Sequence, residues 1–227
     1  MNLYIIMFIH NKYSFCFFLQ KNVFLSKNVI AANALFGLAL PSLAADNREL
    51  RRQLKTDALT QAASREHLIK RAKFEIMRSQ SENSSLSMII FDLDHFKYIN
   101  DSFGHARGDD ALRIISQTAK LLLRPSDLLG RFGGDEFVIV VPGMNNRPAC
   151  VAFAEEIISE LQAAIIVEPH SLNIAASVGI ALSPENGKTA EELLQNTDSA
   201  LYEAKASGRS TYVFYSDDLG EAIRLRS

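Results

Sequence analysis

The sequence predicts an α/β fold of the α+β type, with a central, mostly antiparallel β-sheet of βαββαβ order flanked by helices and a helical extension at the N-terminus. Three observations support this prediction. Apolar strand-like runs alternate with amphipathic helical segments, and a tight glycine turn joins two of the strand-like runs. The helical segments also carry apolar stripes that need a sheet to cover.

The expected elements can be placed in order along the chain. The continuous apolar run Met88–Phe91 is typical of a buried strand, and Asn186-Gly187 and Gly208 mark a turn and the end of a helix. The apolar stripes comprise Leu112, Ile115, Ala119 and Leu122 in one helix and Leu193, Leu194, Thr197, Leu201 and Ala204 in another. The predicted order is helix 65–79, strand 86–91, helix 109–123, hairpin 128–141, helix 148–164, strand 172–182, helix 190–206 and strand 211–214.

Length and composition indicate one domain of ordinary size with an N-terminal extension, because 227 residues with 48% apolar content bury a substantial core. The formal net charge of -2, with basic residues scattered among acids, argues against a nucleic-acid-binding surface. Cys16 and Cys150 are far apart and lack C-x-x-C spacing. We therefore expect neither a disulfide framework nor a zinc site.

Residues 1–45 are apolar and poor in charge. Within them, Val29–Ala45 is an apolar run near the lower limit for a membrane span. Because Pro41–Ala45 is similar to a signal-peptidase site, a cleaved signal peptide is one alternative, and a non-native extension is another. Four basic side chains follow at once: Arg48, Arg51, Arg52 and Lys55. Since such a cluster favours the cytoplasmic side, we interpret residues 1–45 as an uncleaved membrane anchor.

Residues 46–56 have the pattern of a charged helix. Leu43, Leu50 and Leu54 fall at spacings of seven and four, close to a coiled-coil seam, but the segment is too short to be stable alone. Two interpretations stay open: a dimerising stalk, or a surface helix that leads into the domain. On this division residues 57–216 form the folded domain and residues 217–227 a C-terminal tail.

The segment Gly133–Phe137 sets two adjacent carboxylates, Asp135 and Glu136, on a glycine turn between two apolar strand-like runs. We expect the two glycines to form the turn of a β-hairpin and to require positive φ there. The two acids then lie at the mouth of a strand.

A second pair of carboxylates, Asp92 and Asp94, ends the strand that begins near Met88. If the strand continues, both acids lie on one face, whereas a turn beginning at Asp94 leaves Asp92 alone toward the hairpin. If the two strands are neighbours, Asp92 and Asp135 can share a cation. Hard oxygen ligands favour Mg²⁺, with Mn²⁺ as an alternative, and Mg²⁺ usually borrows phosphate oxygens from its substrate. The pattern therefore suits a nucleoside triphosphate.

Residues Asp92–Asp109 follow the pattern D-x-D-x-F-K-x-x-N-D-x-x-G-H-x-x-G-D at every fixed position. Ser177–Ala181 follows S-x-G-x-A, and Ala200–Arg209 follows A-L-Y-x-A-K-x-x-G-R. With these motifs, residues 57–216 resemble a GGDEF-domain diguanylate cyclase, a family that condenses two GTP molecules into cyclic di-GMP. The resemblance implies a palm-like nucleotidyl cyclase fold and a homodimer that carries out the reaction at its interface. It also implies a bacterial protein whose catalytic domain lies in the cytoplasm, and with the anchor expected in residues 1–45 this domain would be tethered to the inner membrane.

The resemblance also implies a metal site and a proton acceptor. Mg²⁺ would be held by Asp92, by Asp135 and by the backbone carbonyl of Leu93. A ribose 3′-hydroxyl of one GTP attacks the α-phosphorus of the other, and either Asp135 or Glu136 accepts its proton, with Asp135 preferred.

Substrate-binding residues follow from the same motifs. Guanine needs an acceptor for its N1 and amino protons, which Asp109 fits, and a donor for its O6, which Asn100 fits. A helix cap and a turn residue are the structural alternatives for these two side chains. His105 lies near the substrate or has a packing role. Lys205 and Arg209, four apart at a helix end, would grip the outer phosphates or be solvated charges.

Arg124 and Asp127 match the R-x-x-D site at which cyclic di-GMP inhibits members of the family. One departure from the family pattern follows the D-x-L-T motif of Asp57–Thr60. Gln61–Ser64 stands where G-L-x-N is usual, so a glycine is missing from a turn and the coupling of stalk to domain is in doubt. Two other functions stay open: a catalytically idle sensor of GTP or cyclic di-GMP, and a regulatory membrane scaffold.

Overall fold

The computed structural model describes residues 3–10, 13–20, 55–164 and 175–226, which belong to two units. In the first unit, β1 (Leu3–His10) and β2 (Tyr13–Gln20) pair as antiparallel strands. The proposed anchor Val29–Ala45 lies outside the described residues, so that interpretation stays a prediction. Among the residues that are described, no helix is long and apolar enough to cross a membrane. Of the predicted stalk, only Lys55 and Thr56 are described, as a turn and a β-bridge to Ala63.

The second unit is built on a five-stranded sheet with the order β4-β5-β3-β6-β7. Neighbouring strands are antiparallel except β6 and β7, which are parallel, so the prediction of a mostly antiparallel sheet is confirmed. The chain order of the core is βαββαβ, with two consecutive helices in the first helical connection, and a helix, a strand and a final helix follow it. The strands are β3 (Leu86–Leu93), β4 (Leu128–Gly133), β5 (Glu136–Pro142), β6 (Ala176–Ser183) and β7 (Tyr212–Phe214).

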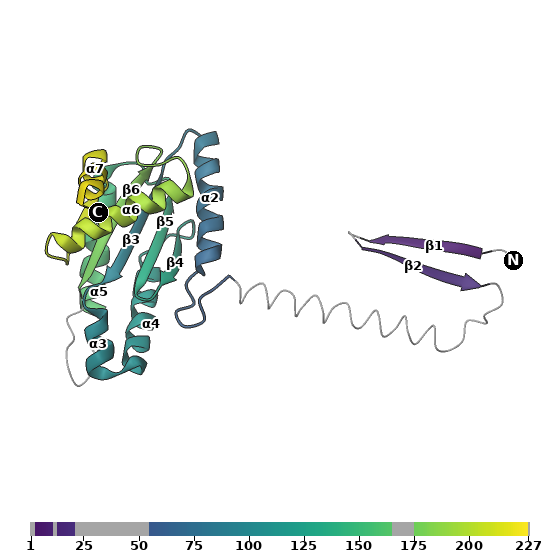
Figure 1. Ribbon diagram of the computed structural model, residues 1–227, viewed down its shortest axis with the longest axis horizontal. Helices are drawn as coiled ribbons and strands as arrows, with labels where there is room; N and C mark the ends of the chain where they lie inside the picture. Colours follow the sequence, from purple (N-terminus) through teal and green to yellow (C-terminus); the bar gives the residue numbers. More distant parts are fainter. Residues whose placement is uncertain (1–2, 11–12, 21–54, 165–174, 227) are drawn as a thin grey trace. The chain divides into compact units, whose positions relative to one another are not determined.

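Helices cover both faces of this sheet (Figure 1). They are α2 (Arg65–Ser81), α3 (Phe96–Phe103), α4 (His105–Leu121), α5 (Arg147–Ala164), α6 (Ala190–Ala206) and α7 (Asp217–Arg226). Helix α6 has the predicted bounds. The predicted helix 109–123 corresponds to α4, but its predicted start at Asp109 is wrong, because α4 begins at His105. Helices α3 and α7 were not predicted.

Two hydrophobic cores lie on the two faces of the sheet because successive side chains of each strand point to opposite faces. In β3, Ile89 and Phe91 pack with α4 and α5, whereas Met88 and Ile90 pack with α2 and α6. The Phe91 ring stacks on the Phe137 ring of β5 with centroids 5.2 Å apart. Burial on both faces explains why these strands are continuous apolar runs.

Side-chain hydrogen bonds cap the N-termini of α2 and α6. The Ser64 side chain accepts a hydrogen bond from the His67 backbone N–H at the start of α2. At the start of α6, the Thr189 and Glu192 side chains form a reciprocal capping box. Such caps typically contribute about 1 kcal/mol each and fix where a helix begins.

Helix α6 lies directly on the backbone of β6. A Cβ atom at Gly179 would come within 2.3 Å of the Thr197 carbonyl oxygen and 2.4 Å of the Leu201 backbone nitrogen. Both neighbouring atoms belong to the helix backbone and cannot move aside individually. The absence of a side chain at position 179 therefore sets the distance between α6 and the sheet.

We expect Gly179→Ala to lower the free energy of unfolding by about 2–3 kcal/mol, since α6 must be pushed away from β6. The measurement is urea denaturation followed by circular dichroism. Gly133→Ala is the matched control, because nothing lies within 4 Å of a Cβ atom built there. Equal midpoints for the two variants would contradict the close packing.

Candidate active site

Strand pairing gathers acidic side chains at one end of the sheet. Asp92 of β3 lies directly opposite Glu136 of β5, so both side chains point to the same face. Asp135 immediately precedes Glu136 in the hairpin turn. The turn itself corrects the sequence analysis: only Gly134 has positive φ, at +50°, while Gly133 still belongs to β4. The tip is therefore formed by Gly134 and Asp135.

The Asp92 carboxylate is largely withdrawn from solvent, with 9% of its side chain exposed. Lys205 of α6 contacts it, with Nζ 2.9 Å from Oδ1. The pKa of Asp92 is raised to about 6. Burial is the largest cause, and the charges of Asp135 and Glu136 act in the same direction, while the Lys205 contact opposes them. The three carboxylates are thus close enough to repel one another.

The pKa values of the other two carboxylates are also raised. Burial raises the pKa of Asp135, opposed by its own backbone hydrogen bond and by Lys205 and Arg131. Burial also raises the pKa of Glu136, and so do the charges of Asp198 and Asp135. One lysine cannot neutralise this group of acids. A divalent cation would do so, because it favours their ionised forms.

The donor set fits Mg²⁺ or Mn²⁺ better than a metal enclosed by protein ligands. Asp92 and Asp135 offer hard oxygens, which these ions prefer. Within the described part of the chain, no three His, Cys, Asp or Glu side chains form a group able to hold a metal by themselves. A cation here would need further oxygens, which the phosphates of a nucleotide can supply.

Asp94 does not join the acidic group, because a turn begins at this residue. The Ser177 hydroxyl and the Ser210 backbone N–H donate to its carboxylate at 2.7 and 3.0 Å, and only 1% of its side chain is exposed. Of the two arrangements left open by the sequence, the one with Asp92 alone toward the hairpin is therefore found.

Lys205 and Arg209 lie at the same end of the sheet, but on different structures. Lys205 is in the last turn of α6, which ends at Ala206. Arg209 lies beyond the helix with a φ of +64°, so the prediction that both share a helix end is wrong. Each still approaches a carboxylate at the end of β3, since Arg209 Nε is 3.9 Å from Asp94 Oδ1. The structure thus brings one basic side chain to each of the two aspartates at the end of β3.

Asn100, His105 and Asp109 lie on the α3–α4 pair. The half-buried Asn100 is a helical residue of α3, and a Cβ atom at Gly108 would be 2.0 Å from its Oδ1. Asn100 therefore packs on the backbone beside Asp109, which is exposed inside α4. Neither structural alternative is found: Gly104 caps α4, and Asn100 is not in a turn. His105 is exposed at the first position of α4.

Arg131 of β4 was not identified from the sequence, yet it connects the acidic hairpin to the segment that precedes α2. Its Nε and one terminal nitrogen donate to the Gly134 carbonyl at 2.9 and 2.6 Å, and its other terminal nitrogen lies 3.1 Å from Asp57 Oδ1. Asp57 in turn accepts from the Thr60 backbone N–H and hydroxyl. Arg131 thereby holds the backbone immediately before Asp135.

The departure at Gln61 does not remove the turn. Gln61 itself adopts a φ of +55°, the conformation that a glycine would favour. The Gln61 backbone N–H donates to the Asp57 carbonyl at 2.9 Å, and the Lys120 amino group donates to the Gln61 carbonyl at 2.8 Å. Hydrogen bonds from neighbouring residues therefore hold a conformation that glutamine rarely adopts.

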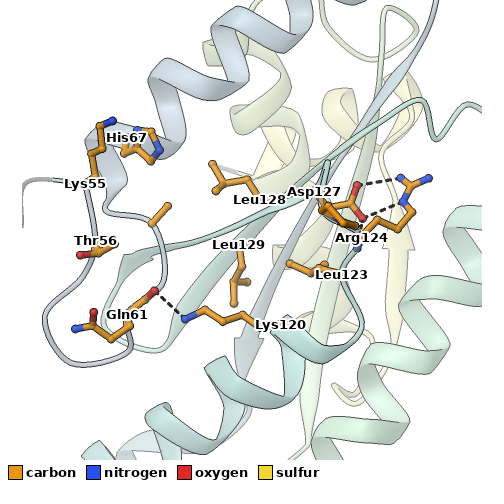
Figure 2. A pocket seen from close by; sticks show the side chains of 12 residues that line it. Lys55, Thr56, Gln61, His67, Lys120, Leu123, Arg124, Asp127, Leu128 and Leu129 are labelled. Atoms are coloured by element: carbon orange, nitrogen blue, oxygen red, sulfur yellow. Dashed lines mark hydrogen bonds and ion pairs between the residues drawn. The ribbon is translucent and has the colours of Figure 1, made fainter. Parts of the chain in front are cut away.

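A pocket lies at the R-x-x-D turn, away from the acidic group (Figure 2). It has a volume of about 540 Å³. Arg124 makes a two-point contact with Asp127, with Nε and a terminal nitrogen each 3.0 Å from a carboxylate oxygen. This contact raises the pKa of Arg124. Three further basic side chains line the pocket: Lys55, His67 and Lys120.

Comparisons with known proteins agree with the motifs. The family model described as diguanylate cyclase, GGDEF domain, matches residues 54–211. Bifunctional diguanylate cyclase/cyclic di-GMP phosphodiesterase MucR of Pseudomonas aeruginosa is 34% identical over 178 residues, covering 78% of this chain and 26% of MucR. Diguanylate cyclase DgcS of Shewanella oneidensis is 36% identical over 165 residues, covering 73% of this chain and 54% of DgcS. The chain thus spans less than two thirds of these relatives.

A solved structure shares the fold. The GGDEF domain of DgcB from Caulobacter crescentus, solved in complex with c-di-GMP, superposes with a TM-score of 0.65 at 25% identity. The match covers 70% of this chain and 92% of the DgcB chain.

Because the pKa of Asp92 is raised, we expect the protein without divalent metal to become less stable as pH rises. The folded state holds this proton up to about pH 6, while the unfolded state releases it near 3.8. The free energy of unfolding should therefore fall by about 2–3 kcal/mol from this group as pH rises from 4 to 7. Asp92→Asn removes that fall, which denaturation in EDTA at a series of pH values measures. Asp101→Asn, at an exposed position of α3, should follow the wild-type curve. Parallel curves for wild type and Asp92→Asn would rule out the predicted proton uptake.

Proposed function

Since this chain belongs to the GGDEF-domain diguanylate cyclase family, we propose that it condenses two GTP molecules into cyclic di-GMP and pyrophosphate. The single observation that carries the proposal is the gathering of Asp92, Asp135 and Glu136 beside Lys205. Acids that repel one another next to a basic side chain suit a cation and a triphosphate bound together.

In this proposal Asp92, Asp135 and the Leu93 carbonyl hold Mg²⁺ or Mn²⁺, which when bound neutralises charge that develops on the phosphate oxygens. The 3′-oxygen of each GTP forms a bond to the α-phosphorus of the other, and at each phosphorus the bond to the pyrophosphate oxygen breaks, so that two pyrophosphate molecules leave for each cyclic product. Lys205 leaves Asp92 to contact the outer phosphates, and Arg209 contacts them from the loop after α6.

The proton of the attacking hydroxyl goes to a carboxylate of the hairpin. Asp135 is occupied as a metal ligand, which leaves Glu136 as the acceptor. Burial and the charge of Asp198 raise the pKa of Glu136, so it is a stronger base than an ordinary surface glutamate. This assignment differs from the preference for Asp135 that the sequence alone suggested.

The α3–α4 pair reads the base. Asp109 accepts from guanine N1–H and the amino group, and Asn100 donates to O6 from its position against Gly108. His105, at the start of the same helix, lies toward the substrate. Adenine would leave these groups without partners, which makes the site selective for guanine.

Each domain presents one GTP, so two copies of the chain must face each other for the reaction. The active species is then a homodimer, and a monomer binds GTP without turning it over. The catalytic domain belongs in the cytoplasm, where GTP is available.

Arg124 and Asp127 form a product-binding site in this proposal. The DgcB domain that shares the fold was solved with c-di-GMP, and here the Arg124 side chain is 54% exposed beside the pocket. A guanidinium held in a fixed orientation by Asp127 is suited to a phosphate or a guanine edge.

Incubating the full chain with GTP and Mg²⁺ and separating the nucleotides by chromatography tests the function. Cyclic di-GMP is expected from the wild type. Glu136→Gln should lower turnover about 100-fold or more while the Kd for GTP changes less than about threefold. Glu160→Gln, at an exposed position of α5, is the control and should turn over normally. Bound but unconverted GTP in the wild type would favour the idle sensor and contradict the proposal.

Product inhibition is tested with Arg124→Ala. We expect this variant to accumulate cyclic di-GMP well beyond the wild-type plateau, at an unchanged initial rate, because the product no longer binds. Arg113→Ala is the control, since Arg113 forms an i,i+3 ion pair with Asp110 at 2.7 Å and Arg124 forms one with Asp127 at 3.0 Å. A plateau equal to that of the control would remove the inhibitory site.

A further inference from the structure

We propose that Asp94 is a positioning residue: it holds the loop after α6 in the conformation that presents Arg209 to the outer phosphates of the nucleotide. The proposal rests on the proposed function, because it assigns Arg209 to GTP. Asp94, the second aspartate at the end of β3, thus supports the site through its contacts with the protein and is not one of the proposed metal ligands.

The Asp94 carboxylate is buried and used entirely by protein groups. Ser177 Oγ donates to Oδ1 at 2.7 Å from β6, and the Ser210 backbone N–H donates to Oδ2 at 3.0 Å. Its side chain is 1% exposed, so an ionised Asp94 depends on these donors and on the nearby guanidinium of Arg209.

The loop that Asp94 contacts has an unusual backbone. Gly208, Arg209 and Ser210 have φ values of +115°, +64° and +48°. Two consecutive non-glycine residues in the left-handed region are disfavoured and persist only where the surroundings hold them. The hydrogen bond from Ser210 N–H to Asp94 is a charge-assisted contact that favours this conformation. Gln162 of α5 also holds the loop, through Nε2 to Ser210 Oγ at 2.8 Å.

The two aspartates at the end of β3 therefore have divided roles. Asp92 contacts Lys205 directly at 2.9 Å and lies beside the hairpin acids. Asp94 fixes the next cation along the chain, both through the loop backbone and through the guanidinium, whose Nε lies 3.9 Å away. Without the charge of Asp94, the loop can relax to ordinary φ values and Arg209 turns away. Removing the charge of Asp94 should therefore weaken binding of the outer phosphates and leave binding of guanine unchanged.

The test compares a triphosphate with a diphosphate. Calorimetry measures the Kd of the full chain for α,β-methylene GTP and α,β-methylene GDP with Mg²⁺. The wild type should prefer the triphosphate, and Asp94→Asn should reduce that preference about tenfold, as Arg209→Ala does. Because both changes act through one contact, the double variant should lose no more than Arg209→Ala alone. Unchanged preference in Asp94→Asn, or a second tenfold loss in the double variant, would overturn the proposal.

A readout without nucleotide separates positioning from a general loss of structure. The Ser210 amide should exchange its hydrogen about tenfold faster in Asp94→Asn than in the wild type, while amides in the middle of β3 keep their rates. Asp218→Asn, at an exposed position of α7, is the control and should change neither exchange nor nucleotide preference. An unchanged Ser210 rate in Asp94→Asn would contradict the bracing role.

Three further outcomes bear on the proposal. If Asp94→Asn loses its cooperative thermal transition, Ser177→Ala replaces it, and a threefold fall in triphosphate preference is expected because one of the donors is gone. An unchanged preference in Ser177→Ala would then overturn the proposal. If the wild type binds both analogues equally well, Arg209 does not contact the outer phosphates and the proposal fails. Binding of neither analogue would contradict the proposed function itself.

Discussion

The antiparallel register of β3 and β5 is the constraint on which the site depends. It places Asp92 opposite Glu136, near the end of β3 and at the start of β5. Burial, together with the smaller effect of mutual repulsion, raises the pKa values of both carboxylates, so keeping them ionised costs the folded protein free energy. The cost is tolerated because the rest of the sheet is buried on both faces and holds the strands firmly. A cation and phosphates would relieve the repulsion, so a feature that weakens the empty protein favours the loaded one.

Supports from outside the two strands complete this geometry. Arg131 holds the Gly134 carbonyl and ties the hairpin to Asp57, so the segment before α2 connects directly to the backbone of the acidic turn. Helix α6 brings Lys205 to Asp92 because Gly179 lets the helix lie against β6. A change in the position of the segment before α2 would be transmitted through Arg131 to the acids.

The sequence predicted the mostly antiparallel sheet, the hairpin and the bounds of α6, because long apolar runs and an apolar helical stripe leave clear periodic signals. It did not predict α3, which buries only Phe96 and Ile99, or the start of α4, where Gly104 supplies no capping side chain. The roles of Asp94 and Arg131 depend on contacts between residues distant in sequence, which no local pattern contains. Two adjacent glycines likewise do not indicate which one takes positive φ.

The central claim is that Asp92 and Asp135 hold one divalent cation together with a triphosphate. Titration with Mn²⁺, followed by electron paramagnetic resonance in the presence of α,β-methylene GTP, tests it most directly. We expect Asp92→Asn and Asp135→Asn each to weaken Mn²⁺ binding about tenfold or more. Asp94→Asn should leave the affinity for the ion within about twofold of wild type. Equal Mn²⁺ affinity in wild type and in both Asp92→Asn and Asp135→Asn would contradict it.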